Sequence, residues 1–127
     1  MVMADKGPVR KFMFYWLPVL LYCLIIFIQS SYPSSQHIPD FDYMDKLLHL
    51  AAYAVLGFLT FRAFMSFKND FSTGAVILLS IVLASLYGAS DEIHQHFVPY
   101  RSADLLDFLA DCIGSIFGAL AGAAVIK

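Results

Sequence analysis

The sequence predicts an all-α membrane protein: one domain built as a polytopic bundle of four transmembrane helices. Of its 127 residues, 60% are hydrophobic and 14% are charged, which is too apolar for an ordinary soluble domain. The apolar residues fall into four stretches, each close to the roughly 20 residues that a helix needs to cross the hydrocarbon core. These predicted spans occupy nearly the whole chain, at about residues 12–29, 44–64, 73–92 and 105–126.

The distribution of charge gives the expected orientation. Bases predominate on one side of the series of spans: Lys6, Arg10, Lys11, Arg62, Lys68 and Lys127, with Asp5 and Asp70. Acids predominate on the other side: Asp40, Asp42, Asp45, Asp91, Glu92, Asp104, Asp107 and Asp111, with Lys46 and Arg101. Because an excess of Lys and Arg marks the cytoplasmic side of a membrane, we expect both termini in the cytoplasm and the acidic end outside.

The first predicted span follows a short basic lead. Tyr15 and Trp16 lie at its inner edge, where amphipathic rings favour the headgroup level, and Pro18 near its start is compatible with a kink. A basic lead before an apolar run also describes a signal peptide. However, the run is long and no small-x-small cleavage site follows it, so we expect this span to be retained.

Short polar connections separate the other three spans. The 66–72 connection carries Lys68 and is expected in the cytoplasm, whereas the connections 30–43 and 94–103 are expected outside. The fourth span contains Gly114, Gly118 and Gly122 at a four-residue spacing, which lets helix backbones approach closely in lipid. Cys23 and Cys112 lie inside spans and are expected to act as small apolar side chains, not as a disulfide.

Polar side chains recur at helical spacing at the outer ends of three spans. The sets are Asp45, Lys46, His49 and Tyr53; Tyr87, Asp91, His94 and Gln95, with Glu92 off that face; and Asp104, Asp107 and Asp111. A rotation of about 100° per residue puts each set on one side of its helix. Since the glycine stripe continues the last face inward, we expect the acids to point into the bundle.

The cost of buried charge indicates a shared pocket. Insertion scales assign about 2.5–3.5 kcal/mol to a charged residue at a helix centre and less near the ends. Several such residues are tolerable when they meet in a hydrated or mutually paired pocket. With Lys46 and Arg101 as the local bases, this pocket is net acidic, and crowded carboxylates beside His49 suit acid–base chemistry. The alternative is a structural ion-pair network that holds the helix ends together.

Several ligand classes are not expected. The cytoplasmic bases are few and scattered, which argues against nucleic acid as a partner, and no phosphate-binding glycine loop or zinc-type cysteine spacing implies a cofactor. Carboxylates and imidazoles in the run 91–96 suggest a metal ligand set. On a helix, however, His94 and His96 would point about 200° apart. No metal site is predicted, although His49 and Asp91 would be the better pair of ligands.

Three motifs carry a resemblance to a known family. They are Asp45-Lys46-x-x-His49-x-x-x-Tyr53-x-x-Leu56-Gly57, Tyr87-Gly88-x-x-Asp91-Glu92-Ile93-His94-Gln95-x-Phe97-Val98-Pro99-x-Arg101, and Asp104-x-x-Asp107-x-x-x-Asp111-x-x-Gly114-x-x-x-Gly118. These motifs resemble those of the VanZ-like family of small bacterial membrane proteins. The chain departs from the family pattern at Tyr100, where Gly is usual, and at Asp111, where Asn is common. The resemblance implies a multi-pass protein of the bacterial inner (cytoplasmic) membrane. The family's named member contributes to resistance to the glycopeptide teicoplanin.

Three functions fit these observations, all with the lipid bilayer as a partner. The first is binding of a lipid-linked or lipidated envelope compound (a lipoglycopeptide, for example) in the outer pocket. The second is a small membrane hydrolase or transferase with His49 as general acid or base, Asp91 as its orienter, and Lys46 and Arg101 on an anionic headgroup. The third is proton-coupled transport by a homo-oligomer. The candidate ligand-binding residues are Asp45, Lys46, Tyr53, Tyr87, Glu92, Gln95, Arg101, Asp104, Asp107 and Asp111.

Overall fold

The computed structural model describes residues 7–31, 44–67, 71–99 and 104–126. It contains the helices α1 (Gly7–Ser31), α2 (Met44–Met65), α3 (Thr73–His96) and α4 (Leu105–Val125). All four are long and apolar enough to cross a membrane, which confirms the predicted all-helical class. The largest differences from the predicted spans are that α1 begins at Gly7 and α3 continues to His96. Hydropathy predicts only the part of a helix that lies in the hydrocarbon core. The helix itself can extend beyond that core, as long as its backbone hydrogen bonds continue.

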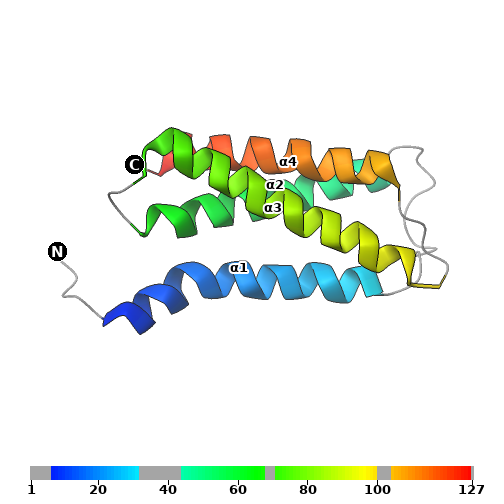
Figure 1. The fold of residues 1–127 in the computed structure, drawn as a ribbon, viewed down its shortest axis with the longest axis horizontal. Helices are drawn as coiled ribbons and strands as arrows, with labels where there is room; N and C mark the ends of the chain where they lie inside the picture. The colour runs from blue at the N-terminus through cyan, green and yellow to red at the C-terminus, as the bar shows by residue number, and fades with distance from the viewer. Residues whose placement is uncertain (1–6, 32–43, 68–70, 100–103, 127) are drawn as a thin grey trace.

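The four helices run side by side as a bundle with one looser member (Figure 1). Helices α2, α3 and α4 pack against one another, while α1 packs on α2 and α3 and, within the described residues, does not contact α4. The start of α1 and the end of α4 lie at the same end of the bundle (Figure 1). An even number of spans requires this arrangement. The side of the membrane that each end faces stays a prediction from charge.

Glycines bring α2 and α4 into backbone contact, as the four-residue spacing predicts. A methyl group at Gly114 would overlap the carbonyl oxygen of Leu50, and one at Gly118 would overlap that of Ala54. On the opposite helix, a methyl group at Gly57 would lie against the backbone of Ser115. The two helices therefore approach as closely as their backbones allow.

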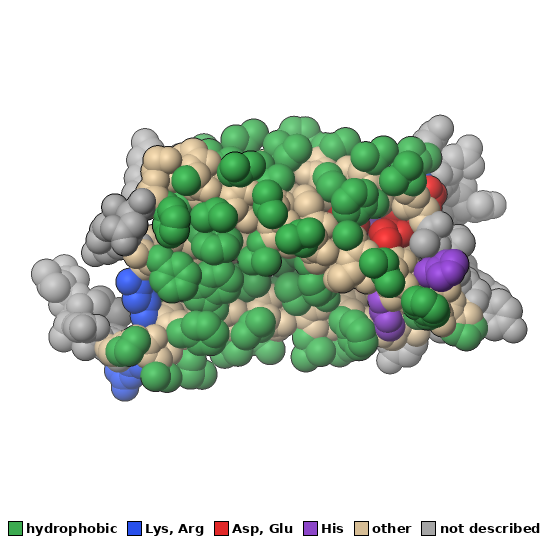
Figure 2. Space-filling model, viewed as in Figure 1, with side chains coloured by type: hydrophobic (Ala, Val, Ile, Leu, Met, Phe, Trp, Pro, Cys, Tyr) green, Lys and Arg blue, Asp and Glu red, His purple; other side chains and the backbone are tan. Residues whose placement is uncertain are grey.

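Side-chain chemistry divides the surface into an apolar belt and two polar ends (Figure 2). Hydrophobic side chains cover the middle of the visible face, with Lys and Arg at one end and Asp, Glu and His at the other (Figure 2). Exposed residues such as Leu20, Leu78, Leu86 and Phe117 belong to this belt. A surface of this kind suits the hydrocarbon of a bilayer. Cys23 and Cys112 are both free thiols, in agreement with the sequence.

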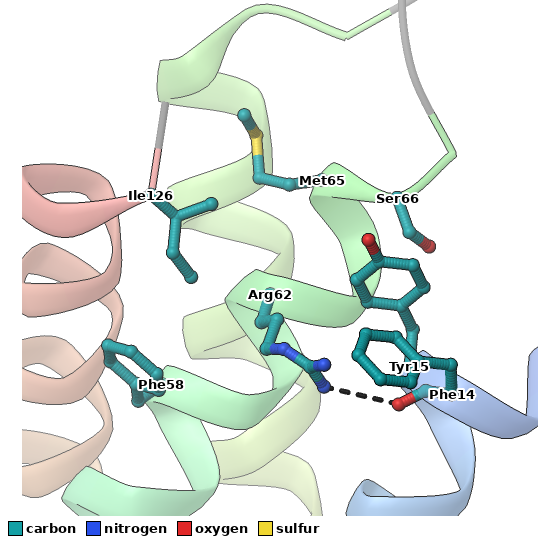
Figure 3. A pocket seen from close by; sticks show the side chains of 7 residues that line it. All are labelled: Phe14, Tyr15, Phe58, Arg62, Met65, Ser66 and Ile126. Carbon is teal, nitrogen blue, oxygen red and sulfur yellow. Dashed lines mark hydrogen bonds between the residues drawn. The ribbon is translucent and has the colours of Figure 1, made fainter. Parts of the chain in front are cut away.

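Pro18 lies within α1, and α2 supplies the hydrogen bond that this proline cannot donate. Proline has no N–H, so the carbonyl four residues earlier, that of Phe14, loses its helical partner. The Arg62 guanidinium of α2 donates to the Phe14 oxygen at 3.2 Å, as Figure 3 shows. The same guanidinium lies 4.6 Å from the centroid of the Phe14 ring and 4.7 Å from that of Tyr15. Arg62 therefore attaches α1 to α2 at the basic end.

Candidate functional site

The predicted polar residues that the structure describes lie at one end of the bundle. They come from the first turns of α2 and α4 and the last turns of α3. Asp91, Glu92, Asp107 and Asp111 are all buried, and Asp45 and Asp104 are more exposed. Asp40, Asp42 and Arg101 lie outside the described residues. The four buried acids therefore point into the bundle, whereas Asp45 and Asp104 lie nearer its surface.

Lys46 is the common partner of three carboxylates. Its Nζ lies 2.8 Å from Asp45 Oδ2, 2.9 Å from Asp104 Oδ2 and 3.2 Å from Asp107 Oδ1. Two of these acids belong to α4, so the ammonium joins the starts of α2 and α4. Because Lys46 is already surrounded by carboxylates, they compete for it with an anionic headgroup. The headgroup role that the enzyme hypothesis gave to Lys46 stays a prediction.

Asp104 also forms the N-cap of α4. Its side chain accepts a hydrogen bond from the Leu106 amide at 2.9 Å, which satisfies one of the free N–H groups of the first turn. The hydrogen bond from Lys46, together with the one from that amide, lowers the pKa of Asp104 below its ordinary value. A depressed native pKa stabilises the folded protein above the ordinary pKa, and the contribution is lost as the pH falls through the native pKa.

We therefore expect a pH-dependent effect of Asp104→Asn. Asparagine keeps a good N-cap acceptor but has no charge. The variant should be slightly less stable than the wild type at pH 7. The difference should shrink below about pH 4, the ordinary pKa of an aspartate, and vanish once wild-type Asp104 is protonated. Thermal unfolding in detergent between pH 3 and pH 7 measures this, and a difference that does not change with pH would contradict the assignment.

His49 pairs with Asp111, not with Asp91. Its Nδ1 is 2.8 Å from Asp111 Oδ1, and its Nε2 is 3.8 Å from Asp107 Oδ2. The side chain of Asp111 is fully buried between α4 and its neighbours. The prediction that Asp91 orients His49 is therefore wrong in its partner, because α4 lies closer to this face of α2 than the end of α3 does. The geometry nevertheless retains a half-buried imidazole held by a carboxylate.

Asp91 belongs to a second group, on the side of the bundle nearest α1. Tyr53 Oη donates to Asp91 Oδ2 at 3.3 Å, and Gln95 Nε2 lies 3.4 Å from the same oxygen. Gln95 Nε2 also donates to Ser30 Oγ at 3.3 Å. This group connects α1, α2 and α3 through polar side chains. Ser30 was not among the candidate residues, and its signal was the polar run 29–31 that ends an otherwise apolar helix.

Glu92 lies on the opposite side of α3, and it is buried as well. Its Oε2 accepts a hydrogen bond from the Asp104 amide at 3.1 Å, which directs the side chain toward α4. Adjacent residues on a helix are about 100° apart, so Asp91 and Glu92 face different neighbours. The sequence placed Glu92 off the interior face, but α3 has two interior faces because it packs against both α1 and α4.

Three other predicted residues lie apart from the carboxylates. Tyr87 donates a hydrogen bond from its hydroxyl to the carbonyl of Cys23 and so fastens α3 to α1. His94 is stacked on Phe27 with 4.5 Å between ring centroids. His96 is exposed at the end of α3. His94 thus packs on α1, whereas the ring of His96 lies against Phe97.

A cavity of about 90 Å³ lies beside the Asp91 group. Its wall is formed by parts of α1, α2 and α3: Ile26, Gln29, Ser30, Asp45, Leu48, His49, Ala52, Tyr53, Asp91 and Gln95. Gln29 and Leu48 are exposed, so the cavity reaches the surface between α1 and α2. A volume of this size holds about three water molecules or a small polar group.

A larger cavity of about 390 Å³ lies at the basic end (Figure 3). It is lined by Phe14, Tyr15, Phe58, Arg62, Met65, Ser66 and Ile126. Arg62 is its charged group, and the guanidinium points toward Phe14 and Tyr15 (Figure 3). Because Arg62 already serves the carbonyl that Pro18 leaves free, we regard this cavity as a gap between α1 and the other helices.

The geometry defines a small membrane protein of four helices with a buried His–carboxylate cluster at one end. A comparison with family models identifies this architecture further: the model described as VanZ/LLP1 matches residues 12–126, so the chain belongs to that family. Comparisons with curated proteins and with solved structures gave no match. The family assignment therefore confirms the resemblance carried by the three motifs.

Proposed function

We propose that this protein binds the polar head of an amphiphile at its acidic end. The observation that carries the proposal is the cavity between α1, α2 and α3. Polar side chains line it beside Ile26, Leu48 and Ala52, so the cavity suits a small polar part of a head group, and an apolar tail would lie outside it along the exposed Leu48. The opening beside the exposed Leu48 gives an amphiphile access from the lipid as well as from water.

The charge of the site favours one kind of head group. Asp45 and Asp91 line the cavity, and Lys46 is neutralised by its three carboxylate partners. An anionic head group would lie against the oxygens of these carboxyl groups, whereas hydroxyl and ammonium groups can donate to them. A lipidated or lipid-linked compound rich in sugar hydroxyls or amines fits these requirements. Teicoplanin, to which the resemblance points, is the first compound to test, and sequestering it would alter susceptibility to it.

Filling the cavity should weaken binding. Ala52→Leu adds bulk to the cavity wall, and we expect it to reduce the affinity of the reconstituted protein for teicoplanin at least about tenfold. Ala51→Leu is the matched control, because Ala51 is exposed on the neighbouring surface of α2. Fluorescence or calorimetric titration in nanodiscs measures both variants. Equal affinities of the wild type and Ala52→Leu, or no affinity for teicoplanin and lipid-linked cell-wall precursors, would contradict the proposal.

A second candidate function, a hydrolase or transferase acting on the same kind of compound, rests on the His49–Asp111 hydrogen bond. A carboxylate on Nδ1 is the arrangement that orients an imidazole as a general base. His49 also lines the cavity and so reaches a bound head group. Product analysis during the same titrations separates the two functions: turnover that His49→Gln abolishes while binding remains favours the enzyme, and binding without turnover favours the first proposal.

A further inference from the structure

We propose that His49, Glu92 and Asp111 form a binding site for a divalent transition-metal ion. One potential ligand atom from each residue lies within 4.8 Å of the other two. The three residues come from α2, α3 and α4, so an ion would bind where the three tightly packed helices meet. This site differs from the pair His49 and Asp91 that the sequence suggested.

Two buried oxygens supply an independent indication. Glu92 Oε1 and Asp111 Oδ2 have no hydrogen-bond partner, although Asp111 is 0% exposed and Glu92 is 8% exposed. A buried polar atom without a partner costs about 1–3 kcal/mol, and more when it is charged. Both oxygens belong to carboxyl groups that converge on His49. A cation bound between these carboxyl groups would give them a partner of opposite charge.

The observed separations suit a metal after a small adjustment. Metal–nitrogen and metal–oxygen bonds of about 2.0–2.2 Å place tetrahedral ligand atoms about 3.4 Å apart. Side-chain rotations can shorten separations of up to 4.8 Å to that value. The hydrogen bond between His49 and Asp111 already brings one pair of atoms to 2.8 Å. Because Asp111 lies on Nδ1 of His49, that nitrogen is the one that would bind the ion, and Asp107, which lies 3.8 Å from Nε2, stays outside the ligand set.

The set of donors selects the ion. One imidazole and two carboxylates suit Zn²⁺, Mn²⁺ or Fe²⁺, whereas Ca²⁺ and Mg²⁺ prefer oxygen ligands alone. Two carboxylates and one divalent ion are neutral together, which lowers the cost of burying the two acids. This inference does not depend on the amphiphile, because the ligand atoms come from α2, α3 and α4, although His49 also lines the cavity next to α1.

Metal titration of the stripped protein tests the site. The full-length protein is purified in detergent, treated with EDTA and titrated with Zn²⁺ by calorimetry and with Mn²⁺ by electron paramagnetic resonance. We expect one ion per chain, and at least about tenfold weaker binding in Glu92→Gln and in Asp111→Asn. Asp104→Asn is the matched control, because it removes one carboxylate from the same end outside the ligand set and should bind as the wild type does.

Clear outcomes would overturn the inference. They are no saturable binding by the wild type, or affinities in Glu92→Gln and Asp111→Asn equal to that of Asp104→Asn. Circular dichroism and thermal unfolding confirm that each variant is folded before titration. If Asp111→Asn does not fold, Glu92→Gln decides alone, because Glu92 is near the end of α3, where a neutral amide keeps the acceptor for the Asp104 amide.

Discussion

Gly118→Ala is expected to lower the free energy of unfolding by about 3 kcal/mol, the upper part of the usual range for overpacking. The added methyl group would overlap the carbonyl oxygen of Ala54. A backbone oxygen cannot rotate away as a side chain can, so α2 and α4 must separate along their closest contact. Unfolding in increasing SDS, followed by circular dichroism, measures the loss.

Gly74→Ala is the matched control for this prediction. Gly74 lies in the first turn of α3, where an added methyl group would meet Ser72 Oγ at 3.9 Å, an ordinary contact. Alanine is favoured over glycine in a helix by up to about 1 kcal/mol, so this variant should be as stable as the wild type or more so. If the Gly118 variant matched the Gly74 variant, the close contact of α2 with α4 would be wrong. Gly122→Ala should be intermediate, because its obstacle is the side chain of Phe61.

Hydropathy was sufficient to predict the helices, because a bilayer requires long apolar segments with internally satisfied backbones. The glycine spacing likewise predicted the packing face of α4. The partner of that face, α2, could not be read from the sequence: small residues indicate close approach but do not identify the opposing helix. The hydrogen bond from Arg62 to the carbonyl of Phe14 could not be predicted either. Pro18 shows that a carbonyl loses its helical partner, but the sequence does not show which donor replaces that partner.

The candidate cluster was predictable as a set of residues but not as a set of pairs. Helical spacing predicted that His49 and the acids lie together at one end of the bundle and point inward. The burial of Asp107 and Asp111 agrees with this prediction. The partner of His49 depends on which neighbouring helix lies nearer, and spacing within one helix carries no such information. Helical spacing correctly placed Glu92 off the face of Asp91, but it did not show that this second face is also buried, because that depends on α4 packing against α3.

Lys46→Met is expected to destabilise the fold by about 2–3 kcal/mol at pH 7. Removing one partner of a buried ion pair costs about 3–5 kcal/mol, and the partial exposure of Lys46 (23%) reduces that cost. The substitution leaves Asp45, Asp104 and Asp107 without their shared cation. The loss should narrow as the pH falls toward 4, because protonated carboxyl groups no longer repel one another. Thermal unfolding of the wild type and the variant across this range measures the effect.

Two further variants separate charge from packing at this position. Lys46→Arg keeps the positive charge and should therefore retain most of the stability of the wild type. Lys46→Met keeps only the packing of the aliphatic stem. Adding Asp107→Asn to Lys46→Met should recover part of the loss, because Asp107 is the most buried of the three acids and suffers most from an absent partner. If the double variant were less stable than Lys46→Met by the full effect of Asp107→Asn alone, the two side chains would be energetically independent. The ion pair between Lys46 and Asp107 would then contribute nothing measurable, and the effect of Lys46 would come from Asp45, Asp104 and its own aliphatic stem.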